Sequence, residues 1–206
     1  MLAPFCSECW SGIEKYTGPA CGICATPFTS EYATVCAECM KKPPLFSKAV
    51  SFGLYEDTLA SAIHFFKFQR IRRLHRPLAD LLLGFDMTGI DALIPVPLSI
   101  RGLRERGFNQ SLLLAKTLSD KNKVPLIMDG LFKRTETPAQ IGLSKKERGL
   151  NLKGSFKTER KFPGMRLLLL DDVMTTGSTA NECSKVLLRA GAEEVLVLTL
   201  ARANYL

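Results

Sequence analysis

Residues 167–179 form the part of this sequence whose residue types and spacing are best suited to chemistry. They read Leu-Leu-Leu-Leu-Asp-Asp-Val-Met-Thr-Thr-Gly-Ser-Thr, so an apolar run ends in two adjacent carboxylates and a hydroxyl-rich turn around Gly177. The glycine lets the backbone approach a ligand closely, and the free amides at the start of a following helix would attract a phosphate group. Asp171 and Asp172 would repel that phosphate. We therefore expect them to bind something else, and the vicinal hydroxyls of a ribose fit that requirement.

The order of these residues resembles the signature of type I phosphoribosyltransferases, which use phosphoribosyl pyrophosphate (PRPP). The resemblance implies that Asp171 and Asp172 hold the ribose hydroxyls. It also implies that the next seven residues wrap the 5′-phosphate: Val173, Met174, Thr175, Thr176, Gly177, Ser178 and Thr179. A nucleotide P-loop is excluded, because the sequence has no Gly-x-x-x-x-Gly-Lys-Ser/Thr run. An ordinary strand, turn and helix is the alternative interpretation.

A second block, residues 95–110, joins a proline-interrupted strand end to a group of arginines. It begins Pro-Val-Pro-Leu and ends Arg-Glu-Arg-Gly-Phe-Asn-Gln. Because arginine binds phosphate oxygens in a bidentate manner, Arg104 and Arg106 are candidates for the pyrophosphate end of PRPP. Helix capping with solvated charges is the alternative.

A third block, residues 134–156, is polar, basic and long for a connection between strands. Loops of this length are usually lids or disordered segments. A lid that closes over PRPP would exclude water and prevent wasteful hydrolysis. Arg134 and Arg148 are its candidates for contact with the pyrophosphate.

Six of the seven cysteines fall in three Cys-x-x-Cys pairs: Cys6/Cys9, Cys21/Cys24 and Cys36/Cys39. Two such turns can place four thiolates around one tetrahedral zinc ion. Zinc is favoured over disulfides in a cytosolic chain, and a redox pair would need a thioredoxin-like pattern that this segment lacks. The spacing is the same in both gaps and does not decide which pairs combine. We favour the second and third pairs, because glycine and proline punctuate that segment, and the first pair is the less certain ligand set.

Three other residues with nucleophilic or metal-binding side chains are expected to have structural roles. Cys183 lies in the helix expected after the glycine turn, where it is interpreted as a small apolar core residue. His64 and His75 lack ligand spacing relative to the cysteines and are expected at the surface or in the core.

Strands and helices alternate after a Lys-Lys-Pro-Pro linker at residues 41–44. The expected strands are 49–55, 92–96, 131–134, 155–157, 166–170 and 195–201, and the expected helices are 58–68, 74–85, 109–119 and 179–190. Such alternation predicts an α/β fold, with a parallel sheet flanked by helices and its ligand at the carboxyl ends of the strands. The sequence thus divides into a zinc-ribbon-like cysteine module, residues 1–42, and a phosphoribosyltransferase-like domain, residues 45–206.

Length, net charge and the lengths of the apolar stretches indicate where the protein works and what kind of ligand it binds. The chain has 206 residues and a formal net charge of +8, and no apolar stretch is long enough to cross a bilayer. A cytoplasmic protein without membrane insertion is therefore expected. The basic residues suit a phosphate-rich ligand, although the charge alone does not separate a pyrophosphate site from a nucleic-acid surface. Phe65, Phe66 and Phe68 lie in one basic stretch and could stack on bases, but their spacing favours a core role.

The ordered combination of these motifs resembles the ComF family, specifically its ComFC-type competence proteins. The resemblance runs from Cys6 to about residue 200. It implies a role in natural transformation, in which incoming single-stranded DNA reaches the cytoplasm.

Two functions are carried forward from the sequence. The first is a phosphoribosyltransferase that binds PRPP with Mg²⁺ beside a structural Zn²⁺, although no general base is evident and Asp172 is only a weak candidate. The second is a PRPP-sensing or single-stranded-DNA-binding accessory protein without transferase activity, with a helicase-like competence protein as its partner. A relative of the amidophosphoribosyltransferases is disfavoured, because the chain lacks room for a glutamine-hydrolysing domain.

Overall fold

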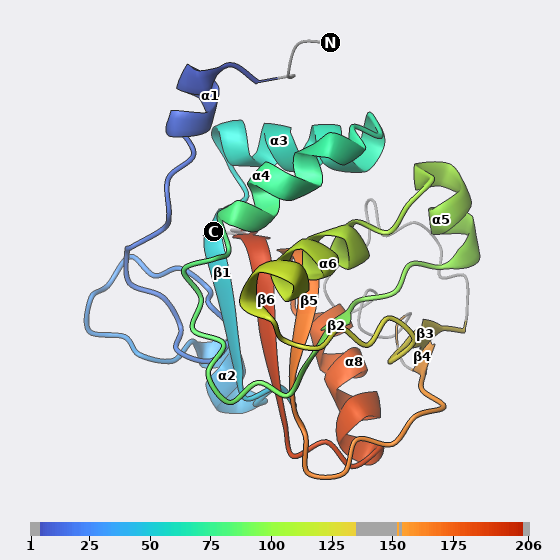
Figure 1. Ribbon diagram of the computed structural model, residues 1–206. Helices are drawn as coiled ribbons and strands as arrows, with labels where there is room; N and C mark the ends of the chain where they lie inside the picture. The colour runs from blue at the N-terminus through green and yellow to red at the C-terminus, as the bar shows by residue number, and fades with distance from the viewer. Residues whose placement is uncertain (1–4, 135–151, 153, 204–206) are drawn as a thin grey trace.

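A four-stranded parallel sheet forms the centre of the molecule (Figure 1). The computed structural model describes residues 5–134, 152 and 154–203. The strands run in the order β1-β6-β5-β2, with bounds β1 (Lys48–Leu54), β6 (Glu194–Arg202), β5 (Arg166–Met174) and β2 (Ala92–Pro95). β5 is flanked by a strand on each side, and its four leucines are fully buried, as expected for a central parallel strand.

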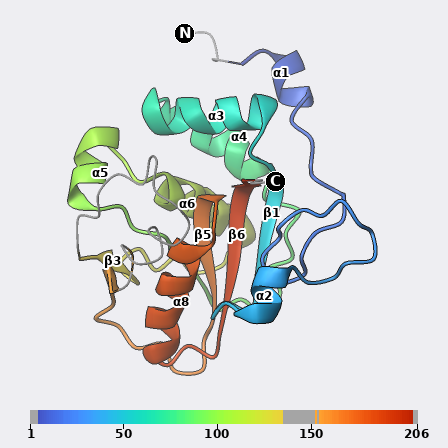
Figure 2. The same cartoon turned by 180° about the vertical axis from the view of Figure 1, so that it is seen from behind.

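Helices and the cysteine segment cover opposite faces of this sheet (Figures 1 and 2). One face carries α3 (Asp57–Phe68), α4 (His75–Asp80) and α6 (Gln110–Asn122). The other carries α8 (Ser178–Arg189) and the segment that contains α2 (Ala37–Lys41). Because side chains alternate along a strand, Leu168 and Leu170 pack in the first core, and Leu167 and Leu169 pack in the second.

The long helices follow from local sequence. In α3 the buried residues recur at helical spacing: Leu59, Ala62, Ile63 and Phe66. The start of α6 is fixed by Asn109, whose side chain accepts a hydrogen bond from the Leu112 amide at 3.3 Å. Both helices therefore bury an apolar stripe in the first core.

Shorter elements complete the described chain. They are α1 (Ser7–Ser11), the 3-10 turn η1 (Arg72–Leu74), α5 (Ile100–Arg106) and an antiparallel hairpin of β3 (Phe132–Lys133) and β4 (Phe156–Lys157). None of the helices in the described part of the chain combines the length and apolar character that crossing a bilayer requires.

The predicted fold class is confirmed, since the chain forms a parallel sheet flanked by helices with a cysteine cluster near its start. Two boundaries differ most from the prediction, and one helix was missed. The central strand continues to Met174, because the sheet partner β6 extends beside it, so the two acids lie inside the strand. The helix expected over 74–85 ends at Asp80, and residues 100–106 form a helix that was not expected. The division into two domains stays a prediction.

Candidate functional site

The chain leaves two neighbouring strands toward opposite faces of the sheet. After β2 it enters α5 and α6 on one face, and after β5 it enters α8 on the other. In open α/β sheets such a divergence opens a crevice at the carboxyl ends of the strands, where ligands bind. The Pro-Val-Pro segment starts at the end of β2 and the glycine turn follows β5, so the two lie at the same edge of the sheet.

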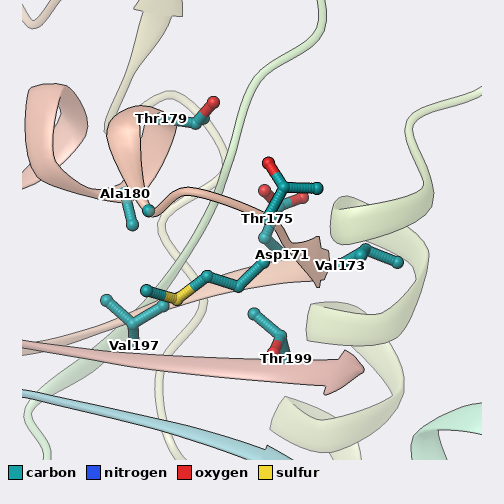
Figure 3. Close-up of a pocket in the computed structure, with 9 residues that line it drawn as sticks. Asp171, Val173, Thr175, Thr179, Ala180, Val197 and Thr199 are labelled. Carbon is teal, nitrogen blue, oxygen red and sulfur yellow. The ribbon is translucent and has the colours of Figure 1, made fainter. Parts of the chain in front are cut away.

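The glycine turn, here called the phosphate loop, comprises residues 175–179. Gly177 has φ +77° and precedes the first helical residue, Ser178, so the turn needs a residue that tolerates the left-handed region. Thr176 Oγ1 and Ser178 Oγ lie 2.8 Å apart. Figure 3 shows a pocket beside this loop, with Thr175 and Thr179 from the loop and Val197 from β6 in its wall. The loop thus presents hydroxyls and the start of a 12-residue helix to one small hollow.

Asp171 lies in the wall of the same pocket. Its Oδ1 accepts hydrogen bonds from the Ser111 hydroxyl at 3.0 Å and from the Asp172 amide at 2.9 Å. Burial and the neighbouring Asp172 carboxylate raise the pKa of Asp171 to about 7, while the Lys67 charge and these hydrogen bonds act in the opposite direction. Asp171 is therefore a carboxyl group that changes charge near neutral pH.

Asp172 is held by a lysine from α3. Lys67 Nζ lies 2.8 Å from Asp172 Oδ1, and only 14% and 8% of the two side chains are exposed. The ion pair is largely shielded from solvent, so neither partner can lose the other without leaving a buried charge. It ties the tip of α3 to the end of the central strand.

A second lysine, Lys133 on the hairpin, is within electrostatic range of Asp171 but forms no hydrogen bond or ion pair with it among the described residues. Lys133 is half-buried, and this burial lowers its pKa, while the negative charge of Asp171 raises it. Its Nζ lies 5.8 Å from the centre of the Phe156 ring. Cys183 is fully buried, and burial raises its pKa well above the usual value, which agrees with the core role expected from sequence.

The predicted arginines are not gathered at one point. Arg106 is half-buried, with its guanidinium 5.4 Å from the centre of the Phe68 ring and one nitrogen 3.2 Å from Gln110 Oε1. Arg104 and Arg134 are exposed. Arg148 and most of the expected lid, residues 135–151 and 153, lie outside the described residues.

Three polar side chains were not predicted from the sequence: Lys67 and Ser111, which contact the acids, and Lys133, which is only within electrostatic range of Asp171. Lys67 follows Ile63 by four positions, and Ser111 precedes Leu114 by three, so both lie on the buried stripe of their helices. A polar residue on an apolar stripe was the available signal. Lys133 carried no comparable signal, because its position depends on the hairpin with β4.

The cysteine cluster consists of Cys21, Cys24, Cys36 and Cys39, as predicted, and its four Sγ atoms lie within 4.8 Å of one another. Tetrahedral zinc–thiolate geometry, with bonds of about 2.3 Å, places sulfur atoms roughly 3.8 Å apart. Cys24 Sγ and Cys36 Sγ are 3.6 Å apart, and three of the four residues are buried. The donor set and its spacing fit a structural Zn²⁺ ion.

Cys6 and Cys9 form a separate pair at the start of α1, with their Sγ atoms 3.4 Å apart. Among the described residues no third ligand joins them in a metal-binding group. The cluster of four therefore agrees with the choice of the second and third Cys-x-x-Cys pairs.

Comparison with proteins of similar sequence shows the family to which the chain belongs. Competence protein F of Haemophilus influenzae is 38% identical over 209 residues, which cover 96% of this chain and 90% of that protein. The chain belongs to the competence protein F (ComF) family. This ComF chain is also 35% identical to DNA utilization protein YhgH of Escherichia coli strain K12, over 96% of this chain and 89% of that protein. Competence protein ComFC of Bacillus subtilis is 31% identical, over 96% and 84%.

No family model matches the ComF chain. Similar solved structures include a glutamine PRPP amidotransferase from B. subtilis, with a TM-score of 0.43 and 22% identity over 61% of this chain and 26% of that one. A hypoxanthine phosphoribosyl transferase of Trypanosoma cruzi has a TM-score of 0.38 and 18% identity over 66% of each chain. Likenesses of this strength carry no conclusion about the activity of the ComF chain.

Proposed function

We propose that this ComF-family protein binds PRPP, with Mg²⁺, at the carboxyl ends of β2 and β5. The observation that carries the proposal is the phosphate loop, which follows the strand that bears Asp171 and Asp172 at the point where the chain diverges to both faces of the sheet. A phosphate at the helix start and a diol at the acids match the two ends of a ribose 5-phosphate unit.

Each part of PRPP would then meet a suitable group. The 5′-phosphate binds the amides and hydroxyls of residues 175–179, and the ribose hydroxyls donate to the carboxylates of Asp171 and Asp172. The pyrophosphate extends toward the segment after β2, where Arg106 is half-buried, and Arg104, Arg134 and Arg148 are further candidates. Mg²⁺ would neutralise the pyrophosphate oxygens and needs few ligands from the protein.

Calorimetric titration with PRPP and Mg²⁺ tests this proposal. Asp171→Asn combined with Asp172→Asn removes both carboxylate charges and leaves only neutral amide acceptors for the ribose hydroxyls. It is expected to weaken binding by about tenfold or more, since a hydrogen bond to a charged group contributes roughly 1.5–3 kcal/mol and a neutral one only about 0.5–1.5 kcal/mol. Asp129→Asn is the matched control, because Asp129 is an exposed acid paired with Arg160 at 2.9 Å. Equal PRPP affinity in the wild type and the double variant would refute the assignment.

A transferase reaction is the first form that this function can take. Pyrophosphate would leave the ribose as an acceptor attacks the same carbon, and the basic groups near the crevice would stabilise the leaving group. The sequence offered Asp172 as a weak candidate for the general base. Asp171 is the better candidate, because its pKa of about 7 lets it take up a proton near neutral pH. Release of pyrophosphate from PRPP with a panel of nucleobases and amines measures this activity.

A second candidate is a PRPP-sensing or single-stranded-DNA-binding accessory role in DNA uptake during natural transformation. It is favoured by an exposed basic and aromatic patch on α3, where Phe65 and Phe68 are 37% and 55% exposed and Arg106 stacks on Phe68. Phe66, in contrast, is fully buried, so the core role expected for the three phenylalanines holds for that residue alone. Such surfaces stack on bases while their cations neutralise phosphates.

Binding of labelled single-stranded DNA at several salt concentrations separates the two candidates. DNA binding with a steep salt dependence and an affinity that Phe68→Ala lowers, without pyrophosphate release with any acceptor, supports the accessory role. Absence of DNA binding at low salt contradicts it.

A further inference from the structure

The last strand ends in a buried arginine whose hydrogen bonds reach two separate parts of the molecule. Arg202 is only 6% exposed. Its Nη1 donates to the carbonyl oxygen of Met174 at 3.0 Å and also to that of Thr175, at the point where β5 enters the phosphate loop. Nη1 thus holds the first peptide groups of the loop that is proposed to bind phosphate.

The other two nitrogens of the same guanidinium reach the cysteine cluster. Nε donates to the carbonyl oxygen of Cys24 at 3.0 Å, and Nη2 donates to Thr26 Oγ1 at 2.8 Å. Thr26 Oγ1 lies 3.1 Å from Cys24 Sγ. Because the hydroxyl oxygen accepts from Arg202, its proton is directed to the sulfur, and a metal-bound thiolate is a strong acceptor for it.

The cysteine cluster can also stabilise the buried positive charge of Arg202. Within the described residues no carboxylate forms an ion pair with it, and its hydrogen-bond acceptors are carbonyl and hydroxyl oxygens. A buried cation needs a nearby negative charge to offset its lost hydration. Four thiolates around one Zn²⁺ carry a net charge of about −2, and they lie one hydroxyl group away.

We propose that Arg202 is a positioning residue that couples the cysteine cluster, through Thr26, to the phosphate loop, so that loss of the Thr26 hydroxyl loosens the loop. The Thr26 hydroxyl lies between Cys24 Sγ and one edge of the guanidinium, and the other edge holds the Met174 and Thr175 carbonyls; a zinc ion bound by Cys24 would fix the first of these contacts. The inference rests on the proposed function only in naming PRPP as the ligand of the loop.

Amide hydrogen exchange of residues 175–179 tests the coupling without any ligand. Thr26→Val removes the hydroxyl while keeping the shape of the side chain, Thr26→Ser keeps the hydroxyl, and Arg202→Lys keeps the charge without the forked geometry. All proteins are compared with zinc bound at one ion per cluster, as measured by metal analysis. The amides of α6 serve as an internal reference, since that helix lies on the opposite face of the sheet from α8.

Thr26→Val and Arg202→Lys are expected to raise exchange in the loop by about tenfold, because a hydrogen bond to a charged group is lost. Thr26→Ser is expected to stay within about twofold of the wild type, and α6 is expected to be unchanged. Equal loop exchange in the wild type and zinc-loaded Thr26→Val overturns the coupling. If Arg202→Lys does not fold, the Thr26 pair alone decides the result.

PRPP titration of the same proteins keeps this inference separate from the proposed function. If the wild type binds PRPP, Thr26→Val should bind it about tenfold more weakly and Thr26→Ser as well as the wild type. If the wild type does not bind PRPP, the proposed function fails, and the exchange experiment still decides whether Arg202 couples the cluster to the loop.

Discussion

Replacing Lys67 by methionine tests how much the buried Lys67–Asp172 ion pair contributes to stability. The substitution keeps an unbranched apolar stem of similar length and removes the ammonium group that lies 2.8 Å from Asp172 Oδ1. Because the Asp172 side chain is only 8% exposed, the carboxylate that remains is an unpaired buried charge. Breaking a buried pair in this way costs about 3–5 kcal/mol of unfolding free energy.

The assay is urea unfolding of the zinc-loaded protein at pH 7. Lys121→Met is the matched control, because Lys121 pairs with Asp80 at 2.5 Å while 45% and 47% of those side chains are exposed. An exposed pair of this kind contributes at most about 1 kcal/mol. In an Asp172→Asn background Lys67 is itself the unpaired buried charge, so Lys67→Met should there be about neutral or stabilising. A loss no larger than that of Lys121→Met, or the same loss in both backgrounds, would refute the reasoning.

Two further predictions concern the metal and the pH dependence. Cys24→Ser should lower bound zinc from about one ion per chain to none, whereas Cys6→Ser should leave it at one, as measured by metal analysis after dialysis. Because the folded-state pKa of Asp171 is about 7, well above its usual value, the folded chain binds the extra proton between about pH 4 and 7. The stability that Asp171 contributes should therefore fall as pH rises through this window, by up to about 4 kcal/mol, and Asp171→Asn should remove that slope from the unfolding curves. Retention of zinc by Cys24→Ser, or identical pH profiles for Asp171→Asn and the wild type, would contradict these expectations.

Much of the fold followed from local pattern in the sequence. The leucine run predicted a central strand, and Asn109 predicted the start of α6, because each depends on residues close by in the chain. The second and third cysteine pairs do lie together in the structure, and their zinc binding stays a prediction. The strand boundary at the acids was wrong, because pairing with β6 prolongs β5 through two charged residues.

The contacts around the acids could not be predicted, because they join residues far apart in the sequence. Lys67 reaches Asp172 across the packing of α3 on the sheet, and Arg202 meets Thr26 across 176 positions. A single sequence shows that such residues are polar within apolar stretches but does not identify their partners. No helix was predicted over the arginine block, because α5 buries none of its residues and so leaves no apolar stripe.

The central claim is that residues 171–179 bind the ribose 5-phosphate part of PRPP, and amide chemical-shift mapping tests it most directly. Titration of labelled protein with PRPP and Mg²⁺ should shift the amides of residues 175–179 most strongly, followed by those after β2, and ribose 5-phosphate alone should reproduce the first group. Saturating PRPP that leaves residues 175–179 unmoved, or that shifts only the surface of α3, would contradict the account.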